Sequence, residues 1–427
     1  MWTTRPLGEI CDDVGGVIQT GPFGSQLHES DYVEDGIPVV MPKNILDGKI
    51  DTSDIAFIKE EDARRLQRHK MSVGDIVYGR RGNIGRRGLI GSRENGWLCG
   101  TGCLRLSLGD RVLDSTYLYY FLGQPMVVGW IANQAIGATM PNLNTGILRS
   151  VVIRYPRLPV QRRIASILSA YDDLIENNTR RIKILEELAQ MLYREWFVNF
   201  RFPGHEKVPM AQSELGPIPR GWSLEPMQNV AEVIDCLHSK KPEPVEDGAG
   251  ILLQLFNVGD SGRLDLFKKY LISEADYKLW TSRIEASAGD CVVTNVGRIA
   301  AVAQIPEGVK AALGRNMTAI RSRKDRMTPT FLIEYLLSPH MASEVLKKKD
   351  AGAIMDSLNV KGIVRLSVLV PPMSLMRAFE GIARPMRRRV ELLVAQNANL
   401  RTTRDFLLPK LISGEVSVEK IEVATMA

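Results

Sequence analysis

The sequence repeats itself at a fixed separation. Residues 74–90 (GDIVYGRRGNIGRRGLI) match residues 289–305 (GDCVVTNVGRIAAVAQI), with several glycines and isoleucines and one aspartate at equivalent places 215 positions apart (289 minus 74). The same separation relates two further pairs of blocks, 137–144 with 352–359 and 156–162 with 371–377. Because three distant blocks share one separation, we predict that the chain folds as two copies of one unit.

Each copy begins with a globular part, which we expect at residues 1–157 and 222–372. Short apolar runs bounded by glycine, asparagine and proline predict strands within 36–42, 74–79, 102–108 and 149–156. Residues 115–125 and 329–339 each predict a helix that stops at a proline. The predicted fold class is therefore α+β, with two tandem domains of this kind.

Each copy ends in a long amphipathic segment, at residues 158–201 and 373–414. Apolar residues recur there at heptad spacing, which favours two helices packed along a common seam. The predicted seam residues are Leu168, Tyr171, Ile175, Ile182, Leu185, Leu192 and Trp196 in the first segment and Met386, Val390, Leu393, Leu400 and Leu407 in the second. Asn178 and Asn397 are polar seam residues of the kind that fixes register. The alternative is that each helix packs only on its own domain.

The remaining segments connect or follow these parts. We expect residues 202–221 to be a linker, because four prolines there oppose regular structure. Residues 415–427 are expected to be a C-terminal tail. The order globule, helix, linker, globule, helix allows antiparallel coiled-coil helices with one globule at each end, related by a pseudo-twofold axis. Pro385 is expected to break or kink the second helix.

The bulk composition fits a globular protein with a polyanionic partner. Lysine and arginine number 55 against 49 acidic residues, which gives a formal net charge of +6. Five scattered cysteines do not form a disulfide framework, and Cys99 and Cys103 are expected to be buried thiols rather than zinc ligands. We see no signal peptide and no apolar run of membrane-spanning length, so we expect a soluble cytoplasmic protein.

Sequence patterns of catalysis are missing. There is no GxxxxGK[ST] phosphate-binding loop and no Asn/Asp-Pro-Pro-aromatic motif of the kind amino-methyltransferases use. The five histidines are dispersed, without a pair at i, i+4 spacing that would bind a metal. We therefore predict no catalytic residue, no metal site and no cofactor in this chain.

Basic and amide side chains beside the turns of both globules are candidates for DNA contact, since arginine pairs with guanine, asparagine with adenine, and either basic residue with phosphate. The candidates are Lys43, Asn44, Arg80, Arg81, Asn83, Arg86 and Arg87 in the first copy and Asn257, Asn295, Arg298, Arg315 and Asn316 in the second. Asn257 matches Asn44 between the two copies. A solvated basic loop is the alternative for the GRRGNIGRRG segment, and a solvated helix face is the alternative for Arg387–Arg389.

The duplicated plan, together with GPFGSQL…DYVEDGIPVVMPKNI (21–45), MPNLN (140–144) and PRLPVQRRIASILSAYDDLIENN (156–178), resembles the specificity subunits of type I restriction-modification enzymes. LYREWFVNFRF followed by LGPIPRGW is similar to the bridge of that family between its first helix and its second recognition domain. The resemblance implies two target-recognition domains, each reading one half of a bipartite site in double-stranded DNA.

The resemblance also implies partners. Two methyltransferase subunits that use S-adenosylmethionine would dock on the helices, and ATP- and Mg-dependent restriction subunits would join them. Two other functions remain open at this stage, a bifunctional restriction enzyme and a coiled-coil DNA-binding adaptor or regulator. The missing methyltransferase and nuclease motifs count against the first of these.

Overall fold

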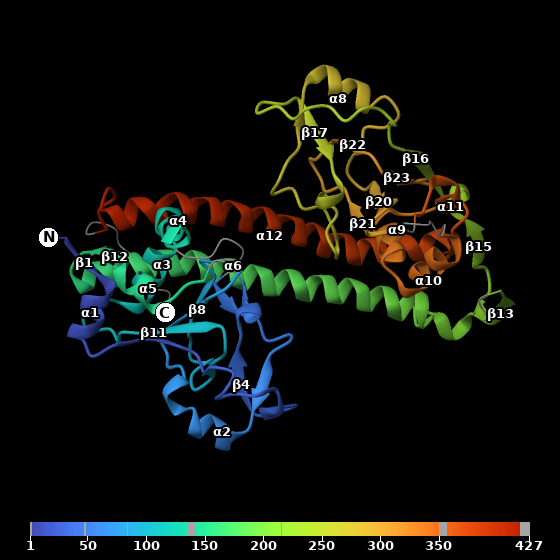
Figure 1. The fold of residues 1–427 in the computed structure, drawn as a ribbon. Coiled ribbons are helices and arrows are strands. Elements are labelled where there is room, and N and C mark those ends of the chain that lie inside the picture. Colours follow the sequence, from blue (N-terminus) through green and yellow to red (C-terminus); the bar gives the residue numbers. More distant parts are fainter. Residues whose placement is uncertain are drawn as a thin grey trace. The chain divides into compact units, whose positions relative to one another are not determined.

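The computed structural model describes residues 2–46, 48–82, 84–134, 142–214, 216–349 and 357–418. The chain divides into two compact units, a first unit of Met1–Ile175 with Asn399–Ala427 and a second unit of Glu176–Ala398. Each unit contains one globular domain and a part of both long helices, α6 (Leu158–Tyr193) and α12 (Met373–Ser413) (Figure 1). The compact units therefore cut across the domain boundaries expected from the order of the chain.

The globular domain of the first unit is α+β. Its helices and strands are β1 (Thr3–Pro6), α1 (Leu7–Asp13), β2 (Val17–Thr20), β3 (Tyr32–Val33), β4 (Ile37–Val40), β5 (Ile45–Leu46), β6 (Lys49–Ile50), β7 (Ala56–Ile58), α2 (Glu60–Arg65), β8 (Ile76–Gly79), β9 (Arg87–Leu89), β10 (Leu98–Cys99), β11 (Cys103–Ser107), α3 (Ser115–Leu122), α4 (Pro125–Gln134), α5 (Thr145–Ser150) and β12 (Val152–Tyr155). The main sheet has the order β2-β11-β8-β9 and a second sheet the order β10-β4-β7-β3. The expected strands and the helix at 115–125 are confirmed.

The globular domain of the second unit repeats most of these elements in the same order. They are β15 (Ser223–Pro226), α7 (Met227–Val230), β16 (Ala231–Asp235), β17 (Gly250–Leu253), β18 (Gly262–Arg263), β19 (Leu271–Ile272), α8 (Glu274–Trp280), β20 (Cys291–Thr294), β21 (Val302–Gln304), β22 (Ala311–Leu313), β23 (Met317–Ser322), α9 (Pro329–Leu336), α10 (Pro339–Lys348), α11 (Val360–Ile363) and β24 (Ser367–Val370). The main sheet has the order β16-β23-β20-β21-β18, and a smaller sheet has the order β19-β17-β22. The internal repeat read from the sequence is therefore also a repeat of structure.

A buried aspartate explains one matched position of the repeat. Asp75 accepts hydrogen bonds from the Ser72 backbone N–H (2.8 Å) and from Arg105 Nε (2.7 Å) just before β8. In the second unit Asp290 accepts from the Ser287 backbone N–H (2.8 Å) and from Arg321 Nε (2.8 Å) just before β20. This carboxylate closes the turn into the central strand and satisfies an arginine of the neighbouring strand, so both copies need it.

The core of each unit joins its sheet to the helix pair. In the first unit Ile76 and Tyr78 of β8 pack in one cluster with Leu168 of α6 and Leu411 of α12. In the second unit the cluster includes Tyr193 at the end of α6, Phe197 of the π-helix Arg194–Val198 that follows it, Phe331 of α9 and Phe379 of α12. Phe197 lies edge-on to both Phe331 and Phe379, with ring centroids 4.8 and 5.1 Å apart. The alternative in which each helix packs only on its own domain is therefore wrong.

Within each unit α6 and α12 run antiparallel, as expected. Leu168 packs with Leu411 in the first unit, and Ile182 packs with Val390 and Leu393 in the second. The predicted seam residues are buried or partly buried: Leu168, Tyr171, Ile175, Ile182, Leu185, Leu192, Trp196, Met386, Val390, Leu393, Leu400 and Leu407. Asn178 donates to Asn397 Oδ1 (3.0 Å) inside the seam, and both amides are buried. A polar pair of this kind favours one register over its neighbours.

The expectation of a break at Pro385 is wrong. Helix α12 continues from Met373 to Ser413 through this residue. Pro385 and Gly381, whose carbonyl loses its intrahelical donor, are both exposed, so water can bind that carbonyl. Seam residues on either side of the proline, Ala383 and Val390, remain buried.

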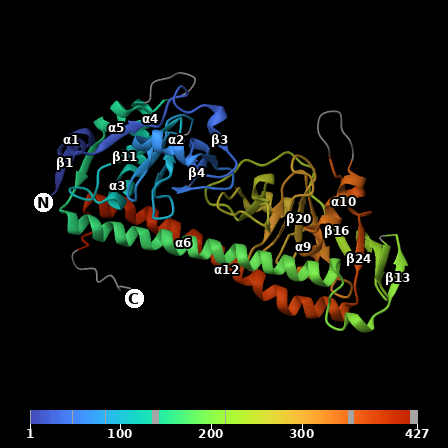
Figure 2. The same cartoon turned by 90° about the horizontal axis from the view of Figure 1, so that it is seen from below.

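The expectation that four prolines exclude regular structure from residues 202–221 is also wrong. The segment contains an antiparallel hairpin of β13 (Met210–Ser213) and β14 (Gly216–Pro219), which lies beyond the end of α6 (Figure 2). Pro217 and Pro219 are two residues apart, so both occupy the non-hydrogen-bonded positions of the ladder, where no N–H is needed. The start of the expected tail is packed too, because Val418 is buried in the first unit's core. Among the described residues no helix has the length and apolarity that crossing a membrane requires.

Candidate nucleic-acid interface

Three loops meet at one end of the main sheet of the first unit. We define the first loop cluster as residues 41–44, 80–82, 84–86 and 100–102; it contains the 3-10 helix η2 (Pro42–Asn44). The Arg80 N–H donates to the Gly102 carbonyl (2.9 Å), and the Gly100 N–H donates to the Val40 carbonyl (3.0 Å). The loops that carry most of the predicted DNA contacts are therefore neighbours in space.

An equivalent cluster exists in the second unit. We define the second loop cluster as residues 254–257, 295–301 and 314–316; it contains the 3-10 helix η6 (Leu255–Asn257). The Asn295 N–H donates to the Asn316 carbonyl (2.9 Å), which repeats the bond between Arg80 and Gly102. Asn316 has φ 63°, the left-handed conformation of Gly102 at φ 82°, so this candidate forms the same tight turn.

Two of the four candidate arginines of the first copy are used to hold the segment between β8 and β9. Arg80 Nε donates to the Leu143 carbonyl (3.1 Å). Arg87 Nε donates to the Tyr119 carbonyl (3.0 Å), and its guanidinium lies over the Tyr119 ring, 4.7 Å from the centroid. Arg81 and Arg86 are exposed, and neither side chain forms a hydrogen bond or ion pair with any described residue. Arg81 and Arg86 are therefore the arginines available to a ligand. Asn83 lies outside the described residues.

The asparagines of η2 and η6 hold turns rather than face solvent. Asn44 is 2% exposed; its Oδ1 accepts from the Met41 N–H (3.0 Å) and its Nδ2 donates to the Asp54 carbonyl (3.3 Å). Asn257 is 0% exposed and makes the equivalent bonds to the Gln254 N–H (2.9 Å) and the Lys268 carbonyl (3.0 Å). Breaking these bonds would cost the buried backbone its partners, so we remove both residues from the predicted base contacts.

Asn295 is not available for the predicted base contact, for the same reason. It is 8% exposed, and its Nδ2 donates to Thr318 Oγ1 (3.0 Å) and to the Leu358 carbonyl (2.7 Å).

Arg298 binds the Val258 carbonyl (2.9 Å) and pairs with Asp260 at the surface. Arg315 is exposed and without a side-chain partner among the described residues. Exposed Lys43 pairs with Asp54. Residues 137–141 and 352–356, which begin the repeated blocks 137–144 and 352–359, lie outside the described residues.

The basic run Arg387–Arg389 is mostly bound within the second unit. Arg387 donates to Glu334 Oε1 (2.8 Å) and to the Gly262 carbonyl (3.1 Å). Arg388 pairs with Glu307 and Glu391, each at 3.1 Å. Only Arg389 fits a solvated helix face, so the run is not a ready phosphate-binding surface.

Known proteins share both the sequence and the fold. The model of the family described as "Type I restriction modification DNA specificity domain" matches residues 1–187. The type I restriction enzyme MjaIX specificity subunit of Methanocaldococcus jannaschii is 25% identical, over 98% of this chain and 94% of that protein. The MjaVIII specificity subunit of the same organism is 20% identical over 79% and 76%. A crystal structure of a type I restriction-modification S subunit from M. genitalium superimposes with a TM-score of 0.61 at 16% identity, covering 96% of each chain.

The chain is therefore similar in sequence to type I specificity subunits and shares the fold of one of them. The family domain covers the first globular domain and most of α6, and the full-length relatives extend the likeness over the second copy as well.

Each globular domain of the chain is joined to the helix pair by a polar bridge at an equivalent place. In the first unit Tyr120 of α3 donates to Asp172 of α6, which also binds Arg404 of α12. In the second unit Glu334 of α9 binds Arg387 of α12. Burial raises the pKa of Glu334, and the nearby Arg387 opposes that shift. These bridges fix how each domain is seated on its part of the helices.

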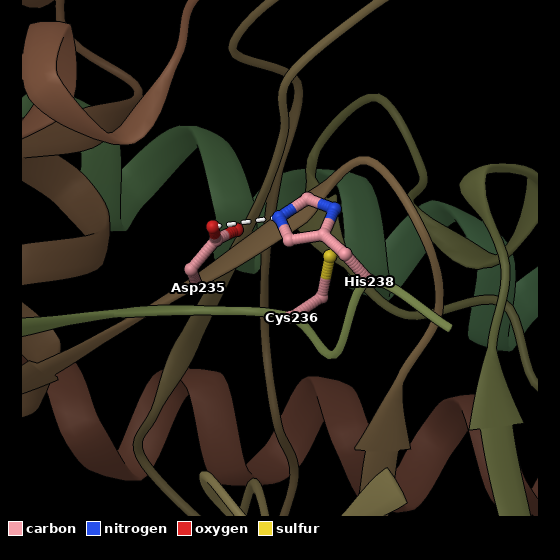
Figure 3. Close-up of side chains that lie close together, drawn as sticks. All are labelled: Asp235, Cys236 and His238. Atoms are coloured by element: carbon pink, nitrogen blue, oxygen red, sulfur yellow. Dashed lines mark hydrogen bonds and ion pairs between the residues drawn. The ribbon is translucent and has the colours of Figure 1, made fainter.

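One group of three side chains in the second unit has the composition of a metal site. Among the described residues, Asp235, Cys236 and His238 bring their potential ligand atoms within 4.8 Å of one another (Figure 3). Asp235 and the His238 ring are hydrogen-bonded (2.8 Å), so each already has a partner. Burial raises the pKa of the Cys236 thiol, which disfavours the thiolate that binds metals. Cys99 and Cys103 are buried as expected, and burial raises the pKa of Cys99 to about 12.

Reasoning from residue type missed exposed apolar side chains beside the loop clusters. Phe256 lies in η6 and Phe267 lies in the turn that Asn257 holds, and both rings are exposed. A search limited to basic and amide residues passes over them. The alignment of MPKN (41–44) with QLFN (254–257) could have found Phe256, because it places a phenylalanine where the first copy has Lys43.

Proposed function

We propose that each loop cluster binds one half of a bipartite site in double-stranded DNA. The observation that carries this proposal is that the two clusters share one hydrogen-bonded framework yet present different exposed side chains. The first offers Arg81 and Arg86, whereas the second offers Arg315 at the turn that Gly102 and Asn316 share. Two loop clusters that recognise different sequences require a common backbone framework with different exposed side chains.

The exposed arginines supply the chemistry. A guanidinium can donate two hydrogen bonds to guanine O6 and N7 in the major groove or bind a phosphate. Arg81 and Arg86 lie next to Arg80 and Arg87, whose side chains bind the Leu143 and Tyr119 carbonyls. Neighbours that are held in place lower the entropic cost of each contact.

We propose further that α6 and α12 dock methyltransferase subunits and that restriction subunits join this assembly. Ile184, Leu188 and Met191 lie at i, i+4 and i+7 on α6 and are exposed, as expected for a helix face covered by another protein. In this proposal the chain itself is not catalytic. S-adenosylmethionine would be bound by the methyltransferase subunits, and ATP with Mg by the restriction subunits.

Replacing Arg81 and Arg86 together by alanine tests the proposed contact. We expect one half-site of the methylated sequence to become degenerate, because each lost base contact costs about 1–3 kcal/mol of discrimination. The other half-site should not change, since the second unit is untouched. The measurement is methylome sequencing of a host that carries the variant and its methyltransferase subunit.

The matched control is Arg64→Ala, which removes an exposed arginine of the same unit from α2. It should leave both half-sites unchanged. An equal loss of binding on all sequences, with a weaker salt dependence, would make Arg81 and Arg86 phosphate contacts instead. An unchanged motif with unchanged affinity would remove the loop from the interface.

A further inference from the structure

The two units contain the same turn with different side chains at its surface. In the first unit the Asp51 N–H donates to the Asn44 carbonyl (2.7 Å), and the Ser53 N–H donates to Asp51 Oδ1 (3.1 Å). In the second unit the Asp265 N–H donates to the Asn257 carbonyl (2.7 Å), and the Phe267 N–H donates to Asp265 Oδ1 (2.9 Å). These bonds make Ser53 equivalent to Phe267 in the structure.

The same framework identifies two further equivalent positions. The amide of Asn44 donates to the Asp54 carbonyl (3.3 Å), and the amide of Asn257 donates to the Lys268 carbonyl (3.0 Å). Asp54 is therefore equivalent to Lys268. The residues directly before the two asparagines, Lys43 and Phe256, are equivalent as well.

The exposed chemistry of these positions differs completely. The first unit presents an ion pair between Lys43 and Asp54. The second unit presents Phe256 with the Lys268 ammonium over its ring, 5.3 Å from the centroid, and Phe267 nearby in the sequence. Lysine and aromatic rings placed together form a surface that suits a nucleic acid, which offers both phosphates and apolar base atoms.

The fold of the second unit does not need the two rings. Phe256 is 48% exposed and Phe267 is 87% exposed, while the core beside them is formed by Val258 and Leu264. Two exposed phenylalanines on one turn cost solubility and are therefore expected to serve binding. Arg298, which binds the Val258 and Gly259 carbonyls, places this turn beside the second loop cluster.

We propose that Phe256 and Phe267 are specificity-determining residues that contact the thymine methyl group of an A·T pair, while Lys268 binds a neighbouring phosphate. This inference rests on the proposed function and names the base class that the second unit reads. Phenylalanine has no hydrogen-bonding group, so among base edges in the major groove it can favour only the methyl group of thymine. The equivalent positions in the first unit, with Lys43 and Asp54, would select a different base.

The test is the double variant Phe256→Ala/Phe267→Ala in the full chain, assembled with its methyltransferase subunit. We expect an A·T position of one half-site to lose its preference by about tenfold, the factor that corresponds to about 1.4 kcal/mol. The other half-site should keep its sequence. The readouts are methylome sequencing and selection of bound duplexes from a randomised pool.

Two control variants make the result specific. Leu279→Ala removes an exposed apolar side chain of the same unit, on α8 and outside the residues of the second loop cluster. It should leave both half-site sequences unchanged. Phe256→Leu/Phe267→Leu keeps apolar side chains and should keep most of the A·T preference. Thermal unfolding at the wild-type temperature would show that the variants are folded, as expected for exposed positions.

An unchanged motif in the folded alanine variant would overturn this inference while leaving the proposed function intact. So would an equal loss of affinity for every sequence, because that result assigns the rings to the backbone. A wild-type assembly that methylates no bipartite site would instead overturn the proposed function, and the inference with it.

Discussion

Inserting one heptad into both α6 and α12 should lengthen the unspecified spacer of the methylated site by about three base pairs. Seven helical residues add ~10 Å at ~1.5 Å per residue, and base pairs are spaced at ~3.4 Å. Insertion after Arg180 and after Ala395 places the new residues between the Asn178–Asn397 layer and the layer of Ile182 and Leu393, so the seam stays in register. Methylome sequencing reads the spacer directly.

Both half-site sequences should persist in this variant, although activity can fall because the insertion also rotates one globular domain around the duplex relative to the other. The control is a seven-residue insertion after Glu246, in an exposed loop of the second unit, which adds the same length of chain without extending a helix. That control should keep the original spacer. The old spacer at undiminished activity in the helix variant would mean that the helices do not set the spacing.

Replacing Arg387 by leucine should destabilise the second unit by about 3–5 kcal/mol, because it leaves a buried carboxylate without its charge partner. Glu334 is 2% exposed and receives a 2.8 Å hydrogen bond from Arg387. Urea unfolding followed by tryptophan fluorescence measures the loss, since Trp222 and Trp280 are buried in this unit. Adding Glu334→Leu should recover much of the stability, because the double variant no longer buries a charge.

The matched control is Arg388→Leu, the adjacent arginine with exposed ion pairs, which should cost less than about 1 kcal/mol. The pH dependence provides a second check. Without Arg387 the pKa of Glu334 should rise further, so the folded state would bind a proton more tightly than the unfolded state, where the pKa is near 4.5. That stabilisation is present at low pH and is lost as pH rises through the folded pKa, so the variant should be less impaired at pH 5 than at pH 8. Equal costs for both arginine variants would contradict this role of the buried pair.

Much of the fold could be predicted because it follows from periodic patterns. The heptads of α6 and α12 depend on the spacing of apolar residues, and the repeat depends on Gly, Asp and Asn residues that hold turns in both copies. The two errors came from proline. The cost of proline in a helix or hairpin depends on whether the backbone at that position needs an N–H donor. In α12 the carbonyl that loses its donor is exposed to water, and in β14 both prolines occupy non-hydrogen-bonded positions of the ladder, so the cost is small.

The candidate site was predicted less well because the type of a residue does not show whether its side chain is already hydrogen-bonded within the protein. Asn44 and Asn257 looked like base-reading amides, yet the repeat preserves them because they close the same turn. Arg80 and Arg87 looked equivalent to Arg81 and Arg86 and differ only in their hydrogen bonds. Residues shared by both copies were better candidates for structure, and the positions at which the copies differ, such as Lys43 and Phe256, were better candidates for recognition.

Methylome sequencing of a host that expresses the unaltered chain with its methyltransferase subunit tests the central claim most directly, in comparison with a host that expresses the methyltransferase subunit alone. If the two globular domains of this chain recognise different sequences, we expect a single bipartite motif with two defined half-sites separated by unspecified bases. This motif should be present only when this chain is present. A contiguous motif, or the same motif without this chain, would contradict the account.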